Sequence, residues 1–295
     1  MGTILAAVGV FVALAIGIPA LLYQRRQTKL AEEARQRQLV ESKGHVDQLQ
    51  RIRTLKHLRI GYVHYPPFSI APAEDNESPT GLYADLIRCL CESEGIVPTF
   101  EQLRFSSALS AIANDQVDVV LSVFQTPRRS QTVDFTAFLH KVSVSGVTRR
   151  QENRVASHAD LAAMPLKFVV CREEIGHEIL EDQLRIPHKQ LTIMDTSNIA
   201  DIIEMVAAGR ADVAIADTLS CQHGLAARGA EGPKLKPVLR RSPLYLCPNG
   251  IMLAKGQSLL ADWLDRGLKK LRSQPDFQKA EETILEEFHG IVIKM

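Results

Sequence analysis

The sequence predicts an α/β fold of two lobes with mainly parallel sheets, preceded by one transmembrane helix and a helical stalk. Three features of the 295-residue chain carry this prediction. A long uncharged apolar run opens the chain, a polar stretch with few Gly or Pro residues follows it, and short apolar strands then alternate with helical patterns to the end. Repeated βαβ units of this kind build parallel sheets with helices on both faces.

The first of these features is the run Thr3–Tyr23, which contains no charged residue. At a rise of about 1.5 Å per residue, a helix of this length crosses a hydrocarbon core of about 30 Å. A cleaved signal peptide is the alternative, but no Lys or Arg precedes the run, and the run is longer than the usual apolar region of about 7–15 residues. We therefore expect an uncleaved anchor over residues 1–23.

A polar stalk over residues 24–57 separates this anchor from the rest of the chain. Its apolar positions do not sustain the heptads of a coiled coil, so a solvated helix is expected. By the positive-inside rule, basic residues directly after the span place the following domain in the cytoplasm. Five such residues occur here: Arg25, Arg26, Lys29, Arg35 and Arg37.

From residue 58 onward the pattern is that of an α/β domain reaching residue 295. Strands are predicted over 58–63, 98–103, 117–122, 167–170, 190–194, 212–217 and 251–255. Helices are predicted over 82–94, 106–114, 176–183, 200–208, 258–273 and 276–288.

Two segments of this domain repeat the same pattern, which favours two lobes over one long sheet. AIANDQVDVVLS (111–122) and VAAGRADVAIAD (206–217) each contain a helix end, a polar turn and a strand that opens on Asp-Val. Ligands of open parallel sheets bind beyond the carboxyl ends of the strands. The residues that follow these two strands are therefore the first candidates for a site.

Composition excludes several other classes. A net charge of +1 offers no basic excess for nucleic acid. With five cysteines at least one is unpaired, and Cys89 and Cys91 point to different sides of a predicted helix, so they do not pair with each other. Because no His/Cys cluster has zinc-ligand spacing, we predict no metal, and no other cofactor is expected.

Charged and aromatic residues follow the predicted strands. Thr126 and Pro127 suit the start of a helix, whose N-terminus favours an anion, and Arg129 can hold a carboxylate through two parallel hydrogen bonds. Asp217 can bind an ammonium group or cap the next helix. Taken together, these groups could receive the two charges of an amino acid. Two aromatic side chains, Tyr65 and Phe105, could clamp the solute between them.

At this point the sequence resembles a known family, the extracytoplasmic solute-binding proteins of family 3, which are amino-acid receptors of bacterial ABC importers. The resemblance covers about residues 58–287 and rests on three segments: LRIGYVHYPPFSI, GLYADLIRCLCESEG and VDVVLSVFQTPRRSQTVDFT. It implies a periplasmic-binding-protein type II fold. Lobe 1 would comprise residues 58–141 and 248–295, lobe 2 residues 142–247, and hinges would lie near 142–146 and 245–248.

The same resemblance assigns roles to individual residues. It implies that Ser122, Thr126 and Arg129 bind the ligand carboxylate, that Asp217 binds the ammonium group, and that two aromatic rings stack on the ligand. Those rings are Tyr65 and Phe105.

The sequence departs from the family pattern after the first strand of lobe 2. Cys171–His177 lacks the expected glycine and hydroxyl residues and carries Glu173 and Glu174 instead. Acidic residues there would repel a carboxylate and attract a cation, so we expect a basic or amine-bearing ligand, with Glu174 among its contacts. Phe124 replaces a small hydroxyl residue and would narrow the pocket.

The leading hypothesis is thus a membrane-anchored protein, not an enzyme, that binds an amino acid or similar zwitterion by hinge closure. It would deliver the ligand to an ABC permease or a membrane sensor. The resemblance places the domain on the periplasmic side of the inner membrane, against the positive-inside count. One alternative is a dehydratase of the cyclohexadienyl type on the same fold, with Glu173, Glu174 or Glu178 as the acid. A second alternative is a scaffold that binds no solute.

Overall fold

A computed structural model describes residues 47–74, 77–229 and 234–295. The chain divides into two compact units, Met1–Leu55 and Lys56–Met295. In the first unit the described element is helix α2 (Gln48–Leu55), which falls within the predicted stalk. The predicted anchor and the remainder of that stalk lie outside the described residues. Among the residues that are described, no helix has the length and apolar character of a membrane span.

The second unit is built on an eleven-stranded mixed sheet with a central path β2-β1-β3-β10-β5-β8-β6-β7. The first strands along the chain are β1 (His57–Tyr62), β2 (Val97–Gln102), β3 (Val119–Phe124), β4 (Val133–Phe135), β5 (His140–Arg149) and β6 (Phe168–Cys171). The later strands are β7 (Leu191–Met194), β8 (Val213–Asp217), β9 (Leu235–Val238), β10 (Tyr245–Ala254) and β11 (Val292–Lys294).

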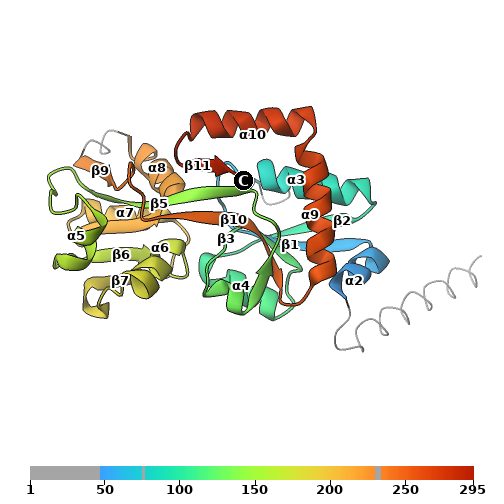
Figure 1. Cartoon of the computed structure of the whole chain (residues 1–295), viewed down its shortest axis with the longest axis horizontal. Coiled ribbons are helices and arrows are strands. Elements are labelled where there is room, and N and C mark those ends of the chain that lie inside the picture. The colour runs from blue at the N-terminus through green and yellow to red at the C-terminus, as the bar shows by residue number, and fades with distance from the viewer. Residues whose placement is uncertain (1–46, 75–76, 230–233) are drawn as a thin grey trace, which may run out of the picture. The chain divides into compact units, whose positions relative to one another are not determined.

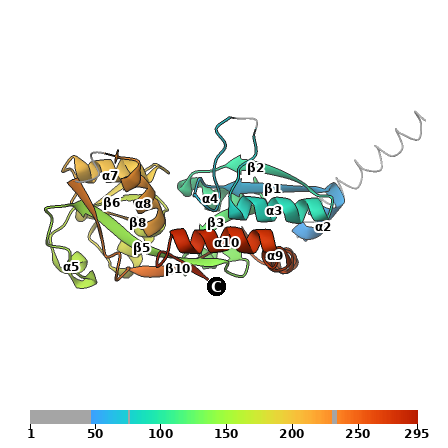
Figure 2. The same ribbon diagram turned by 90° about the horizontal axis from the view of Figure 1, so that it is seen from above.

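Helices cover this sheet. The α-helices are α3 (Leu82–Ser93), α4 (Phe105–Ala113), α5 (His158–Ala163), α6 (Ile175–Glu178), α7 (Ile199–Ala207), α8 (Thr218–Ala226), α9 (Ser258–Arg272) and α10 (Pro275–Glu287). Short helical turns are the 3-10 segments η1 (Arg129–Gln131) and η3 (His188–Gln190) and the π-helical segment η2 (Ile179–Gln183). Helices α9 and α10 pack against α3, as Figure 2 shows.

The elements gather into two lobes joined by the long strands β5 and β10 (Figure 1). We call β1–β4 with α3, α4, α9 and α10 lobe 1, and β6–β9 with α5–α8 lobe 2. Within each lobe the central strands are parallel, β1 with β2 and β3, and β6 with β7 and β8. The prediction of a mainly parallel sheet was wrong at the crossing, because β5 and β10 pass between the lobes in opposite directions and pair antiparallel with each other and with β3 and β8.

The internal repeat marks equivalent places in the two lobes. Asp118 precedes β3 and Asp212 precedes β8, and each carboxylate accepts a backbone N–H from the start of the adjacent strand, that of Arg59 and that of Lys167, both at 2.9 Å. These bonds fix the register at the amino ends of the two strands. By fixing the two strands at their amino ends, the bonds also place the carboxyl ends of β3 and β8, where a ligand is expected.

Each lobe encloses its own apolar core. In lobe 1 the core packs α4 against β3 and β10, and in lobe 2 it packs α7 against β6 and β8. The five cysteines are free thiols, so Cys89 and Cys91 are not paired with each other, as predicted.

Candidate ligand-binding site

The carboxyl ends of β3 and β8 face one pocket between the lobes. Six of the seven predicted ligand-binding residues line it, and the seventh, Thr126, lies directly behind Arg129. The room left for solvent is about 30 Å³, enough for one or two water molecules. The lining residues are Val63, Tyr65, Phe105, Ala108, Leu109, Ser122, Val123, Phe124, Arg129, Glu173, Glu174, Ile175, Asp217 and Met252.

Arg129 enters from lobe 1 on a short turn that follows β3. The Thr126 hydroxyl accepts the Arg129 backbone N–H at 3.1 Å, so Thr126 caps the turn as predicted. The prediction that a helix starts at Pro127 was wrong in its start and length, because the segment forms a 3-10 helix of only three residues that begins at Arg129. Such a short segment has no appreciable dipole, and its contribution to the site is to hold the guanidinium.

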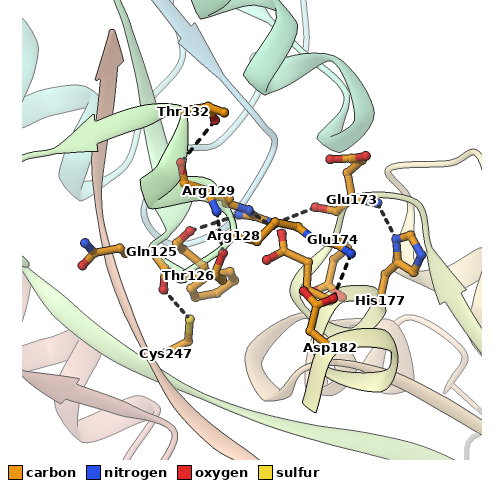
Figure 3. Close-up of polar contacts among 12 residues, drawn as sticks. Gln125, Thr126, Arg128, Arg129, Thr132, Glu173, Glu174, His177, Asp182 and Cys247 are labelled. Carbon is orange, nitrogen blue, oxygen red and sulfur yellow. Dashed lines mark hydrogen bonds and ion pairs between the residues drawn. The ribbon is translucent and has the colours of Figure 1, made fainter. Parts of the chain in front are cut away.

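That guanidinium is bound by the protein itself, and most of its bonds cross to lobe 2. Its Nε–H donates to Glu178 Oε1 at 2.6 Å, its Nη2–H to the carbonyl of Glu173 at 2.6 Å, and its Nη1–H to the carbonyl of Phe124 at 3.1 Å. The side chains of Arg129 and Glu178 are only 8% and 5% exposed. Figure 3 shows Arg129 extended toward Glu173. Arg129 therefore closes the pocket as part of a buried ion pair between the lobes.

The lobe 2 side of the pocket carries two buried carboxylates. Glu174 accepts N–H groups of Gly176 (2.6 Å) and Asp217 (3.2 Å), and Asp217 accepts the N–H of Ser220 at 2.9 Å. Asp217 thus caps helix α8 and also faces the pocket. Within the described residues neither carboxylate forms an ion pair.

Burial and mutual repulsion set the protonation of these two groups. Desolvation, followed by the charge of Asp217, raises the pKa of Glu174 to about 8. Desolvation likewise raises the pKa of Asp217, although its bonds with Ser220 and Tyr65 oppose the shift. The pair therefore holds a proton at neutral pH that a nearby cation would displace.

A glycine allows Glu174 to reach this position. A Cβ on Gly176 would lie 2.2 Å from the carbonyl oxygen of Ile215 in β8, so only glycine fits where α6 approaches that strand. This close approach brings Glu174 beneath the backbone of Asp217.

The predicted aromatic residues both lie at the pocket, but each also joins the lobes. The Tyr65 hydroxyl donates to Asp217 Oδ1 at 2.9 Å, and the ring stacks on Phe68. The Phe105 N–H donates to the Ser197 hydroxyl at 3.0 Å, and its ring packs against the core of lobe 2.

Ser122 lies in β3 with a φ of 60°, a left-handed conformation that costs a non-glycine residue of the order of 1–3 kcal/mol. Its hydroxyl is 2.6 Å from that of Ser69. Glu173, on the opposite lobe, has a φ of 61°. Backbone strain thus occurs on both sides of the same pocket.

Sequence reasoning missed one functional residue, Glu178 in its role as partner of Arg129. Glu178 entered only as a candidate acid of the alternative enzyme. Its spacing of four from Glu174 is a signal that was available, since residues four apart share a helix face. A further pair of contacts between the lobes runs from the neighbouring Arg128 to Glu181 at 3.1 Å and to Asp182 at 2.9 Å.

Comparison with known families agrees with this architecture. Residues 58–287 match the bacterial extracellular solute-binding proteins, family 3, and the chain belongs to that family. It is thus an α/β protein of the periplasmic-binding-protein type II fold, with amino-acid-binding proteins among its relatives.

Individual relatives are distant. The chain is 24% identical over 158 residues to the arginine-binding extracellular protein ArtP of Bacillus subtilis (strain 168), a match that covers 52% of this chain and 58% of that protein. The chain therefore spans little more than half of this curated relative.

Two solved structures share the fold. A histidine kinase sensor domain with similarity to periplasmic binding proteins has a TM-score of 0.68 and 24% identity, over 81% of this chain and 98% of that one. The ancestral amino-acid-binding protein AncCDT-1, a precursor of cyclohexadienyl dehydratase, has a TM-score of 0.64 and 22% identity, over 81% and 99%.

Proposed function

We propose that the chain is a membrane-anchored solute-binding protein that captures an amino acid or similar amine-bearing zwitterion between its lobes. The observation that carries the proposal is the opposition of Arg129, from lobe 1, to Asp217 and Glu174, from lobe 2, across one pocket. Closure around a solute would lower the local dielectric and strengthen its contacts with both charges.

The motion would be a hinge closure about β5 and β10. We propose lobes of residues 58–141 with 248–295 and of residues 142–247, since these two strands are the long connections between the halves of the sheet. The closed protein would then deliver its solute to an ABC permease or report occupancy to a membrane sensor. The likeness to a histidine kinase sensor domain supports signalling to a membrane sensor, and the arginine-binding relative supports delivery to a permease.

A thermal-shift screen of the full-length chain, purified in detergent, tests this proposal. The panel would contain amino acids, amines and aromatic acids. A solute present at about 100 times its dissociation constant should stabilise the protein by about 2.7 kcal/mol. An Asp217→Asn variant should lose the shift, while the Glu282→Gln variant on exposed α10 should retain it. The absence of any shift across the panel would contradict the proposal and favour a scaffold that binds no solute.

One observation favours a second candidate, a dehydratase of the cyclohexadienyl type. Glu174 is protonated at neutral pH, because burial raises its pKa to about 8, and it lines the pocket as a general acid would. Consumption of prephenate or arogenate by the wild type and its loss in Glu174→Gln would establish the enzyme. Binding of a solute without turnover would exclude it.

The proposed location is the inner membrane, with the binding domain on the periplasmic side. The basic residues 25–37 favour the opposite orientation, but a receptor meets incoming solute only outside. A reporter that is active only in the periplasm, fused after Met295, should therefore be active. If a cytoplasmic reporter is active instead, the protein cannot be an import receptor, and a sensor of internal metabolites becomes the favoured role.

A further inference from the structure

The groups expected to bind a ligand carboxylate all have partners within the protein. The Ser122 hydroxyl is 2.6 Å from that of Ser69, the Thr126 hydroxyl accepts the Arg129 backbone N–H, and the Arg129 guanidinium is paired with Glu178. Three of the five side-chain N–H groups of Arg129 donate to protein acceptors, including the Nε–H that a side-on carboxylate requires. The carboxylate subsite is thus already filled by a side chain of lobe 2.

The charges around the pocket do not balance. Arg129 and Glu178 neutralise each other, which leaves Glu174 and Asp217, both at most 2% exposed, without a cationic partner among the described residues. Glu178 is not among the lining residues, but its second carboxylate oxygen, Oε2, is buried beside Arg129 and has no hydrogen-bond partner in the described part of the chain. A ligand carboxylate would have to enter beside Glu174 and Asp217, with Arg129 already paired to Glu178. An ammonium or guanidinium group would instead displace the proton that these two carboxylates hold and take its place as their partner.

The remaining lining suits an aliphatic body rather than a second polar end. Half of the lobe 1 lining is aliphatic, namely Val63, Ala108, Leu109, Val123 and Met252. Apolar side chains of this kind make no hydrogen bonds to a carboxylate and pack well against methylene groups.

From these contacts we propose that the solute is a small aliphatic organic cation that carries no carboxylate, with Glu178 occupying the carboxylate subsite as the counter-ion of Arg129. The inference rests on the part of the proposed function that has this pocket capture a small amine-bearing solute, and it replaces the zwitterion proposed above by a cation without a carboxylate. It makes Glu178 a specificity-determining residue, because its charge excludes an amino acid that has the same cationic side chain.

Pairs of compounds that differ only in the carboxylate give a direct test. Isothermal titration of the full-length chain would compare agmatine with arginine and cadaverine with lysine. The decarboxylated member of each pair should bind at least about tenfold more tightly, because the α-carboxylate meets like charge.

Variants of the two inter-lobe pairs locate the cause of this preference. Glu178→Gln should reduce the preference by about tenfold or reverse it, since the freed Arg129 can then receive the α-carboxylate. Glu181→Gln, whose carboxylate pairs with the exposed Arg128, is the matched control and should leave the preference unchanged. The wild-type comparison requires no variant to fold.

Each other result overturns the inference in a recognisable way. Tighter binding of arginine and lysine by the wild type would mean that Glu178 gives way to the ligand carboxylate. Binding of neutral amino acids alone would contradict the inference and leave the proposed function standing. If no compound in either pair and no amino acid binds, the proposed function fails together with it.

Discussion

Glu281 in lobe 1 and Glu174 in lobe 2 are both buried glutamates, but their surroundings are opposite. Glu281 contacts three basic groups: Arg272 Nη2 and Lys294 Nζ at 2.5 Å and His140 Nε2 at 3.0 Å. These contacts outweigh desolvation and lower the pKa of Glu281 to about 2. Glu174 has only backbone N–H donors and a neighbouring carboxylate, and its pKa rises to about 8.

Under the proposed function, this difference separates a structural carboxylate, Glu281, from a binding one, Glu174. Both side chains are at most 2% exposed, so low solvent exposure alone does not identify a site. A buried acid whose counter-ions come from its own lobe stabilises the fold, whereas a buried acid without one retains affinity for a cation from outside.

The largest effect is expected at the structural carboxylate. Glu281→Gln should lower the free energy of unfolding by about 3–5 kcal/mol, because it removes the buried negative charge that pairs with Arg272 and Lys294. In the wild type this contribution is complete above the ordinary glutamate pKa and is lost as the pH falls toward about 2. Urea denaturation at several pH values measures both effects, with Glu282→Gln as the exposed control. A loss below about 1 kcal/mol would remove the distinction between the two glutamates.

A substitution of Glu174 should change the affinity for the solute rather than the stability of the fold. Glu174→Gln should weaken the binding of a cationic solute by about 2–5 kcal/mol. Its free energy of unfolding should stay within about 1 kcal/mol of wild type, since the substitution also removes repulsion with Asp217. Calorimetry and urea denaturation of the same variant measure the two quantities. Unchanged affinity, or a stability loss as large as that of Glu281→Gln, would show that Glu174 is structural.

The raised pKa of Glu174 predicts a specific pH dependence of binding. A cation binds the ionised form, so below about pH 8 each binding event expels the proton. Affinity for a solute that stays cationic should therefore rise with pH, by up to about tenfold per unit, and level off above about pH 8. Titrations in buffers of different ionisation enthalpy would detect the released proton. A flat profile in the wild type would contradict the assignment, and Glu174→Gln should give that flat profile.

The smallest effect is expected at the exposed counterpart of the Arg129 ion pair. Arg128 is 44% exposed where it pairs with Glu181 and Asp182. Arg128→Gln should change stability and affinity by less than about 1 kcal/mol, and salt should abolish the difference. A larger change that resists salt would indicate that this pair, and not the buried one, holds the lobes together.

Most helices and the parallel strands were predictable because their periodicity is local, whereas helices α5 and α8 were not predicted. The strand-end positions of Ser122, Arg129 and Asp217 followed from the alternation of elements, and the repeated Asp-Val marked equivalent strands. Strand β5 was missed as a strand and treated in part as a hinge. Its serines alternate with valines as on a half-exposed strand, yet Ser143 and Ser145 are fully buried within the sheet.

Contacts between the lobes were not predictable in the same way. Arg129 and Glu178 are 49 residues apart, and their pairing depends on how the lobes meet rather than on either local pattern. The same holds for Tyr65 and Asp217, which are 152 residues apart. Sequence therefore indicated which residues surround the pocket but not that its arginine is occupied.

Under the proposed function, the contacts that join the lobes would also set the timing of solute capture. The pocket has room for one or two water molecules while Tyr65 is bonded to Asp217 and Arg129 to Glu178, so a larger solute requires these contacts to open. Entry then waits for a spontaneous opening, so the observed association rate should level off with rising solute concentration at the opening rate. The apparent affinity is reduced by the fraction of molecules that are open. Escape is subject to the same gate, and a captured solute remains until the next opening.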